Sequence, residues 1–368
     1  MKYSNDLRTV MTLDAGGTNF VFGAISSFNE IMDPIHLPSA ANNIELCLAN
    51  IKNGFHAVRS RLQEKGIAPV AISFAFPGPA DYKNGIIGDL GNLPAFRGGI
   101  ALGPMLQEEF GIPVFVNNDG DLYAYGESIA GFLPFINSEL EKAGSPRRYK
   151  NLVGLTLGTG FGGGLVCDGN LYIGDNCSGM EVWTMSQRYC TANNIEENIS
   201  IRAVKRAYAE ATGTTFENAP NPKDIFDIST GAREGNKEAA LEAFQKMGRA
   251  LGDALCNILT MTDTLAVIGG GVAGAREVFL PAAIEEMNSQ FEKYGNPRLT
   301  QKIYNLDNST DLEEFSKGSV TQITIPGSTK TVTYDPVARI GFGFSQIGTS
   351  KAISIGAYAY ALSQIDKN

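Results

Sequence analysis

The chain has 368 residues, 43% hydrophobic and 19% charged, a balance that is ordinary for a soluble globular enzyme and that allows two domains with a substantial core each. The formal net charge of −9, without a long basic run, argues against a nucleic-acid partner and against binding to an anionic membrane surface. No segment is apolar over the length that a membrane span requires, and residues 1–8 lack the apolar core of a signal peptide.

The first predicted element is a pair of short strands, Val10–Leu13 and Phe20–Ile25, joined by a turn with a carboxylate, two glycines and a hydroxyl. Adjacent glycines bring backbone N–H groups close to an anion, and the hydroxyl can donate to a phosphate oxygen. The carboxylate would repel a bare phosphate, which indicates a metal ion between them. An ordinary hairpin turn is the alternative. The polar members of the turn are Asp14, Gly16, Gly17 and Thr18.

A buried strand over 69–76 follows a helix expected over 43–65, and it runs straight into the turn Pro77-Gly78-Pro79. Such a turn either delivers backbone to a cleft at the carboxyl end of the strand or simply ends the strand. The sequence leaves both interpretations open.

A strand-to-helix junction carries Asn118 and Asp119. It follows a helix over 102–110 and a strand over 114–117, and it precedes a helix from about 122 to 130. A carboxylate at such a junction is either a helix N-cap or a general base that points into a cleft.

The glycine-rich turn recurs in the second half of the chain. A polar stretch over 136–150 is interpreted as a surface excursion, and a strand over 152–157 then leads into Gly158-Thr159-Gly160 and a strand over 165–167. Two such turns, one in each half, would hold a polyphosphate from both sides. The spacing of the glycines also matches a dinucleotide-binding motif, but that motif must open a helix, and here it opens a hairpin.

A second glycine-rich junction comes later, where a strand over 264–268 leads into Gly269-Gly270-Gly271 and a helix over 275–291. The triple glycine either offers N–H donors and room for a flat ring or allows close helix–strand packing. Between the two junctions, Glu181 lies in a loop beside the only tryptophan. The helices expected after this loop cover 199–212, 229–235 and 236–259.

From 297 to 344 the sequence alternates polar and β-branched residues, and a hairpin is expected over 320–333 as a surface decoration or a subunit contact. An apolar helix over 352–365 closes the chain. These elements predict an α/β fold of two duplicated domains around a nucleotide cleft. We expect an N-terminal domain over 1–118, completed by the helix at about 352–368, and a larger domain over 119–351 with an insertion at about 297–344.

With these motifs the chain resembles the ROK family (repressors, open reading frames and sugar kinases) of the actin-like ATPase and hexokinase superfamily. The resemblance runs from about Val10 to Ile284 and resumes over 348–362. It rests on Asp14-Ala15-Gly16-Gly17-Thr18, Pro77-Gly78-Pro79, Asn92-Leu93-Pro94-Ala95-Phe96, Asn118-Asp119 with Gly126-Glu127, Leu157–Gly164, Glu181 and Gly269-Gly270-Gly271-Val272.

The resemblance implies two duplicated actin-like ATPase (RNase H-like) domains around a nucleotide and sugar cleft, and it implies a role for each motif. Asp119 is the implied catalytic base, and Asp14 is implied to orient Mg²⁺ through water or phosphate. The implied nucleotide-binding residues are Gly16, Gly17, Thr18, Gly158, Thr159, Gly160, Gly270 and Gly271. The implied sugar-binding residues are Gly78, Asn92, Asn118, Asp119 and Glu181.

The sequence departs from the family pattern at three places. Asn19 stands where many members carry lysine, and Thr184 stands where the family has a histidine that contacts sugar and zinc. The cysteine-rich zinc segment is missing, and Cys190 is its only remnant. We therefore expect no structural zinc and a partly rebuilt sugar pocket.

The resemblance implies ATP-dependent phosphorylation of a hexose or hexose derivative, in the manner of a glucokinase or an N-acylhexosamine kinase, by a homodimer. Five dispersed cysteines without a Cys-x-x-Cys pair indicate free thiols and a cytoplasmic location. The alternatives are a sugar-sensing regulator and a catalytically silent sugar-binding protein. The regulator is disfavoured because the residues before Val10 leave no room for a DNA-binding segment.

Overall fold

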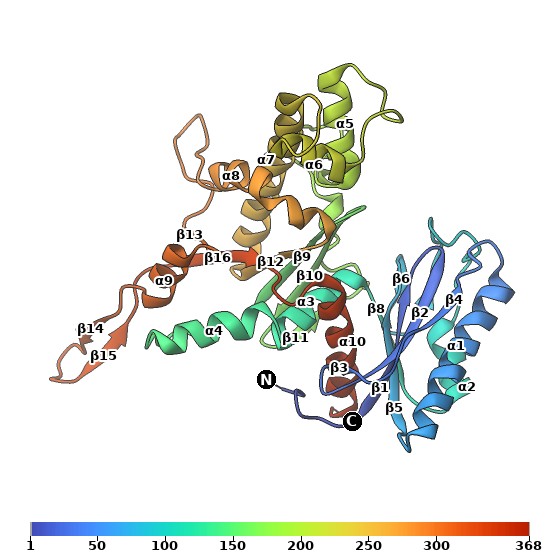
Figure 1. Ribbon diagram of the computed structural model, residues 1–368. Coiled ribbons are helices and arrows are strands. Elements are labelled where there is room, and N and C mark those ends of the chain that lie inside the picture. Colours follow the sequence, from blue (N-terminus) through green and yellow to red (C-terminus); the bar gives the residue numbers. More distant parts are fainter. Residues whose placement is uncertain (1, 368) are drawn as a thin grey trace. The chain divides into compact units, whose positions relative to one another are not determined.

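The structure is a computed structural model that describes residues 2–367, and these divide into two compact units (Figure 1). Unit 1 holds the described residues up to Gly131, then Gly164–Gly179, and those from Ile347 onward. Unit 2 holds Phe132–Gly163 and Met180–Gln346. The domain boundaries expected from the sequence stay a prediction.

Unit 1 is built on a sheet of order β3-β2-β1-β5-β8, with β4 also paired to β2. β1 is antiparallel to β2, as a tight turn requires, and parallel to β5, which is itself parallel to β8. The carboxyl ends of these three parallel strands therefore meet at one edge. The bounds are β1 (Thr9–Ala15), β2 (Asn19–Ser26), β3 (Asn29–Glu30), β4 (Ile35–Pro38), β5 (Pro69–Ala75) and β8 (Val114–Asn117), with a small pair β6 (Ala80–Asp81) and β7 (Ile86–Ile87).

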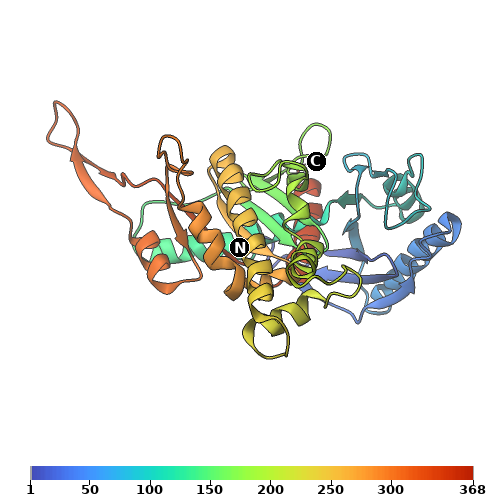
Figure 2. The same ribbon diagram turned by 90° about the horizontal axis from the view of Figure 1, so that it is seen from above.

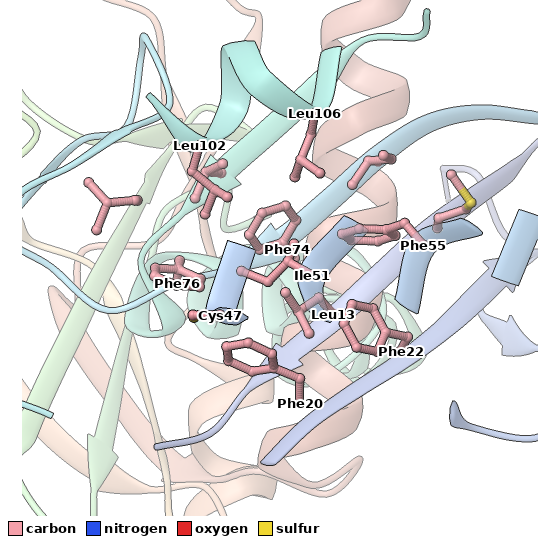
Figure 3. Close-up of a cluster of buried hydrophobic side chains, with 14 of the residues drawn as sticks. Leu13, Phe20, Phe22, Cys47, Ile51, Phe55, Phe74, Phe76, Leu102 and Leu106 are labelled. Atoms are coloured by element: carbon pink, nitrogen blue, oxygen red, sulfur yellow. The ribbon is translucent and has the colours of Figure 1, made fainter. Parts of the chain in front are cut away.

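Helices cover both faces of this sheet. Helices α1 (Ile44–Glu64) and α2 (Leu102–Phe110) enclose an aromatic core that includes Phe22, Phe55 and Phe74 (Figure 3). Residues that alternate with these along the strands belong to a second cluster with α3 (Asp119–Ile129) and α10 (Thr349–Ile365), as the two-residue period of a strand dictates.

Two glycines allow α3 and α10 to pack closely. A Cβ on Gly126 would lie 1.9 Å from the carbonyl oxygen of Ala352, and one on Gly356 would lie 2.0 Å from that of Leu122. Any larger residue at either position would clash, so glycine at both positions is what allows α3 and α10 to pack this closely.

The second sheet has the order β11-β10-β9-β12-β16-β13. β9, β12, β16 and β13 are parallel, and Gly269 of β12 lies opposite Thr156 of β9, so the glycine-rich ends of these two strands are neighbours. The bounds are β9 (Leu152–Leu157), β10 (Phe161–Cys167), β11 (Asn170–Tyr172), β12 (Leu265–Gly269), β13 (Lys302–Asn305) and β16 (Arg339–Phe344).

Three helices of unit 2, α5, α6 and α8, pack around a long central one, α7, whereas α4 contacts α9. A separate hairpin of β14 (Thr321–Thr324) and β15 (Thr331–Tyr334) extends beyond α9 (Figure 2). The bounds are α4 (Phe132–Lys142), α5 (Ile201–Thr212), α6 (Pro222–Thr230), α7 (Lys237–Thr262), α8 (Arg276–Met287) and α9 (Ser309–Lys317), with short 3-10 helices at Val182–Thr184, Ile195–Glu197 and Gly271–Ala275.

The structure corrects two local predictions. The stretch over 136–150 is not all surface excursion, because α4 runs through its first part and buries Phe132, Ile136 and Leu140 at helical spacing. The helix expected over 229–235 is α6, which begins after the N-cap Asn221 and ends at Gly231, whose φ of 85° stops it. The hairpin expected over 320–333 is confirmed, but β13 and β16 on either side of it belong to the main sheet. In the part of the chain that the structure describes, every helix is too short or too polar to cross a membrane.

Candidate active site

The first group of predicted residues lies at the carboxyl edge of β1, β5 and β8 in unit 1. The strand register places Asp14 beside Ala75, and Ala75 beside Asn117, so the segments that follow these positions leave the sheet together. Asp14 is exposed at this edge. Ligands of open α/β sheets bind at such carboxyl edges.

The first glycine turn is closed by its own backbone. The N–H of Gly16 donates to the carbonyl oxygen of Asn19 at 3.0 Å, and a Cβ on Gly16 would lie 2.8 Å from that oxygen. Ser39 donates its hydroxyl to the carbonyl oxygen of Gly17 at 2.6 Å and its N–H to that of Thr18 at 2.9 Å. Ser39 thus occupies two carbonyl oxygens of the turn, and the N–H groups of Gly17 and Thr18 are the donors that an anion would use.

Asn92 lies next to this turn, on a loop that its apolar neighbours anchor. Leu93 and Phe96 are fully buried, and the ring of Phe96 packs 5.3 Å from that of Phe76. Asn92 itself is exposed, and its carbonyl oxygen would lie 3.6 Å from a Cβ on Gly17. The predicted sugar loop and the predicted phosphate turn are therefore neighbours within unit 1.

Tyr82 links two predicted sugar-binding segments and was not predicted from the sequence. Its hydroxyl donates to the carbonyl oxygen of Phe76 at 3.0 Å and accepts from the side-chain amide of Asn118 at 3.4 Å. A Cβ on Gly78 would lie 2.9 Å from this hydroxyl, so the turn needs glycine there. A tyrosine in a turn-rich stretch gives no sequence signal of such a role.

Asp119 is the first residue of α3, and the side chain that caps this helix is that of Asn118. The amide oxygen of Asn118 accepts from the N–H of Gly120 at 2.8 Å, and Oδ1 of Asp119 accepts from the same N–H at 2.9 Å. Neighbouring protein atoms crowd around the carboxylate of Asp119, but its surface is still in contact with solvent. The loss of hydration raises the pKa of Asp119, and the negative charge of Asp14 raises it further, against the hydrogen bond from Gly120. A raised pKa makes this carboxylate a stronger base.

The second group lies at the carboxyl edge of β9 and β12 in unit 2. The N–H of Gly158 donates to the carbonyl oxygen of Gly160 at 3.0 Å and closes the turn. Gly270 has a φ of 90°, and a Cβ on it would lie 2.2 Å from the carbonyl oxygen of Leu157. The predicted second phosphate turn and the glycine-rich junction with the implied nucleotide-binding residues Gly270 and Gly271 are thus packed directly together.

Two charged residues that were not predicted from the sequence hold this second turn. Oε2 of Glu196 accepts from the N–H of Phe161 at 3.0 Å and would lie 2.5 Å from a Cβ on Gly160. The guanidinium of Arg202 donates to Glu196 at 2.9 Å and to the carbonyl oxygen of Thr159 at 3.4 Å. These residues come from a separate segment of the chain, so the motif itself carries no sign of them.

Glu181 is exposed and precedes the 3-10 helix Val182–Thr184. Its carboxylate accepts from the indole N–H of Trp183, and its carbonyl oxygen accepts from the hydroxyl of Thr184 at 2.8 Å. Thr184, which replaces the expected histidine, is used to fix the backbone here. A Cβ on Gly163 would lie 3.0 Å from Val182, so this loop packs on β10 close to the second turn.

The side chains at this edge fit a magnesium ion whose ligands are mainly phosphate oxygens and water, with few from the protein. Among residues 2–367, no cluster of three or more His, Cys, Asp or Glu side chains is placed to hold a metal. A single exposed carboxylate, Asp14, beside N–H donors for phosphate fits Mg²⁺, which is commonly bound through one or two carboxylates, phosphates and water.

The structure therefore gathers the predicted site residues into two sets, one in each unit. Unit 1 holds Asp14, Gly16, Gly17, Thr18, Gly78, Asn92, Asn118 and Asp119. Unit 2 holds Gly158, Thr159, Gly160, Glu181, Gly270 and Gly271.

Solved structures identify the fold class. A ROK hexokinase from Thermus thermophilus is 19% identical, covers 97% of this chain and 99% of its own, and superposes with a TM-score of 0.66. The predicted class, an α/β fold of the actin-like ATPase type, is confirmed.

The chain matches the sequence model of the ROK family over residues 10–303, and it belongs to that family. It is 51% identical to the glucokinase of Parabacteroides distasonis, whose crystal structure covers 99% of both chains with a TM-score of 0.91. The glucokinase of Halalkalibacterium halodurans is 26% identical, and the match covers 79% of this chain and 88% of that protein. The N-acetyl-D-glucosamine kinase of Vibrio cholerae is also 26% identical, and that match covers 76% of this chain and 88% of that protein.

Proposed function

We propose that the protein is an ATP-dependent sugar kinase that phosphorylates a hydroxyl of glucose or a closely related hexose. The observation that carries this proposal is the carboxylate of Asp119, which has a raised pKa and lies at the head of α3 on the same sheet edge as the phosphate turn of β1. Relatives named glucokinase and N-acetyl-D-glucosamine kinase confirm the predicted class of enzyme. The 51% identical glucokinase favours glucose over an N-acetylhexosamine.

In the proposed reaction, Asp119 accepts the proton of the sugar hydroxyl while that oxygen attacks the γ-phosphorus in line. Because the transition state of phosphoryl transfer is loose, the base acts mainly by orienting the hydroxyl and by removing the proton late. Asn118, held by Tyr82, and Asn92 supply amide groups for other hydroxyls of the sugar. Thr18 and the N–H groups of each glycine turn supply donors for the phosphates of ATP.

Magnesium, when bound with ATP, would neutralise charge on the phosphates, and Asp14 would orient it. We propose a cytoplasmic location, because the protein carries five free cysteines and burial raises the pKa of the Cys47 thiol to about 11 and that of Cys256 to about 12. Unreactive thiols of this kind suit a reducing compartment. A homodimer is the proposed assembly.

The test is an assay of ADP release with Mg-ATP against glucose, fructose, mannose, N-acetylglucosamine, N-acetylmannosamine and allose. We expect the highest kcat/KM with glucose. Asp119→Asn keeps the size of the side chain but removes the base, so we expect turnover to fall by at least about 10²-fold, while calorimetry still detects glucose binding. Near-normal turnover of this variant would remove Asp119 from its role. Glucose binding without turnover in the unmodified protein would favour a silent binding protein.

A further inference from the structure

Four charged side chains of unit 2 gather between α7 and α8, outside the two groups of site residues described above. The guanidinium of Arg298 lies 2.6 Å from Asp253 of α7 and also contacts Glu286 of α8, and these three side chains are only 3% to 5% exposed. Arg188 adds a second positive charge, with its guanidinium 3.3 Å from Glu286. Two carboxylates thus face two guanidinium groups, and this ion cluster carries no net charge.

Close packing of the two helices makes the ion cluster possible. A Cβ on Gly248 would lie 2.2 Å from the carbonyl oxygen of Phe279, and one on Gly252 would lie 2.5 Å from that of Ala283. Apolar side chains at such a contact would hold the helices together without the desolvation penalty of several kcal/mol that each buried ion carries. Stability alone therefore does not explain the buried charges, and we looked for their role in what the two carboxylates bind.

The carboxylates of the ion cluster hold the tip of a loop over residues 185–198. Oδ2 of Asp253 accepts from the backbone N–H of Arg188 at 2.9 Å, and Glu286 accepts from the hydroxyl of Tyr189. Burial and this hydrogen bond raise the pKa of Tyr189 to about 12, so its hydroxyl stays protonated and remains a donor at neutral pH. Backbone and side chains of the tip are therefore both attached to the ion cluster.

The same loop is closed at its base by hydrogen bonds of its own. The N–H of Ile195 donates to the carbonyl oxygen of Met185 at 2.9 Å. The side-chain amide of Gln187, which is buried, donates to the carbonyl oxygen of Asn194 at 2.9 Å and accepts from the side chain of Asn198. These bonds tie the two ends of the loop to each other, so both ends depend on where its tip is anchored.

Each end of the loop leads to a predicted substrate-binding region. Before the loop, the 3-10 helix Val182–Thr184 connects it directly to Glu181, an implied sugar-binding residue. Near its other end, Glu196 accepts from the N–H of Phe161 and so holds the second phosphate turn. A single anchored loop therefore connects Glu181 with the support of the phosphate turn.

We propose that the ion cluster positions groups that bind both substrates: it anchors the tip of the loop and thereby keeps Glu181 in place for glucose and Glu196 in place beneath the turn for ATP. The inference rests on the proposed function for the identity of the substrates, whereas the anchoring itself does not. Asp119, the proposed base, belongs to unit 1, and the ion cluster and its loop belong to unit 2. Loss of the anchor should therefore weaken the binding of both substrates and leave kcat nearly unchanged.

The test variant is Arg188→Met with Tyr189→Phe. It removes the side-chain contacts that the loop makes with Glu286 and keeps Arg298 between the two buried carboxylates. Arg298→Met is less suitable, because two buried carboxylates would lose their shared cation and the chain might not fold.

The matched control is Arg233→Met with Tyr208→Phe, the same two substitutions at another place in unit 2. There Arg233 pairs with Asp224, and the hydroxyl of Tyr208 accepts from the N–H of Asn236 at 3.4 Å. Thermal unfolding shows whether each variant is folded and how much stability it has lost.

The only tryptophan of the chain provides a readout that needs no substrate. Trp183 is 40% exposed and donates its indole N–H to Glu181, so its fluorescence reports on this end of the loop. We expect acrylamide to quench Trp183 more strongly in the ligand-free test variant than in the unmodified protein or the control.

The second readout is steady-state kinetics with each substrate varied in turn. In the test variant we expect KM for glucose and KM for ATP each to rise about three- to tenfold, an effect between that of an exposed ion pair and that of a buried hydrogen bond to a charged group, with kcat within about twofold. The control should keep both KM values. A purely structural role of the ion cluster would lower the unfolding temperature without this rise of both KM values.

Unchanged quenching of Trp183 in the test variant would overturn the anchoring. A rise of only one KM, a rise equal to that of the control, or a loss of stability with unchanged KM values would each overturn the proposal that one loop serves both substrates. An unmodified protein without turnover would instead refute the proposed kinase activity. Calorimetric dissociation constants for glucose and for ATP would then replace the KM values in this comparison, and an absence of binding would overturn the present proposal as well.

Discussion

The two glycine-rich turns have the same order of strand, turn and strand, but different contacts hold them in place. In both, a threonine one residue before the last leucine of the strand faces a glycine of the next strand: a Cβ on Gly23 would lie 3.5 Å from the hydroxyl of Thr12, and one on Gly162 would lie 2.6 Å from that of Thr156. Both turns also begin with an N–H that bonds back to a carbonyl oxygen of the same turn. Strand, closed glycine turn and strand thus recur in both halves, although the closing bond spans three residues in the first turn and two in the second.

The difference lies in where each turn finds its charged residues. The first turn carries its own carboxylate, Asp14, and a clash at Gly16 would involve only the backbone of Asn19. The second turn contains no acidic residue and takes Glu196 from a distant segment, with Arg202 as the counter-charge. In the proposed reaction the first turn would therefore hold a metal-linked phosphate with local groups, whereas the second turn depends on tertiary contacts.

Among the variants that test this difference between the two turns, Asp14→Asn is expected to have the largest effect on activity. Loss of the carboxylate that orients Mg²⁺ should lower kcat by about 10²- to 10³-fold, as for other groups that stabilise transition-state charge. The variant also tests the pH profile. A base must be deprotonated, so the raised pKa of Asp119 places the acid limb of kcat/KM above the ordinary range for aspartate, with activity lost as pH falls through it.

Removal of the Asp14 charge takes away one of the two causes that raise the pKa of Asp119, so the acid limb should move to lower pH. The measurement is kcat/KM for ATP against pH at saturating glucose, which reports the state before Mg-ATP binds, with residual activity followed in Asp14→Asn. An unchanged limb, or one that moves upward, would contradict the electrostatic coupling of these two carboxylates.

The same contrast explains which parts could be predicted from the sequence. Asp14, Asn118 and Asp119 could be singled out because each lies at or just after the end of an apolar strand, where hydrophobic periodicity and turn chemistry are easily recognised. Tyr82, Glu196 and Arg202 could not be found, because a hydrogen bond to a distant carbonyl or N–H group leaves no local pattern. Helix α4 was missed in part for a related reason: its polar residues outnumber the few buried ones that pack it.

A smaller effect, which tests a single contact, is expected on the binding of ATP when the glycine of each turn is replaced by alanine. Gly160→Ala places a methyl group 2.5 Å from the carboxylate of Glu196, and we expect the KM for ATP to rise about tenfold, which is about 1.4 kcal/mol. Glu196→Ala makes room for this methyl group, so the double variant Gly160→Ala with Glu196→Ala should bind ATP no worse than Glu196→Ala alone. Gly16→Ala clashes with backbone at 2.8 Å and has no such side-chain rescue.

Kinetics with ATP as the varied substrate measure both variants, and thermal unfolding controls for their folding. The comparison fails if Gly160→Ala remains equally impaired in the presence and absence of the Glu196 side chain. In that case the second turn would be limited by its own backbone, as the first one is.

The smallest expected effect distinguishes two arginines of the same helix. Arg202 and Arg206 are 39% and 38% exposed, and both pair with Glu197, but only Arg202 also contacts Glu196 and the carbonyl oxygen of Thr159. Exposed ion pairs contribute about 0.2–1 kcal/mol, so Arg202→Ala should raise the KM for ATP by about 1.4- to fivefold. Arg206→Ala should leave it unchanged, and neither variant should alter the KM for glucose. Equal effects of the two would mean that α5 supports the turn through general packing, whereas an effect of Arg202 alone would show that the second turn depends on a charge supplied from outside its own sequence.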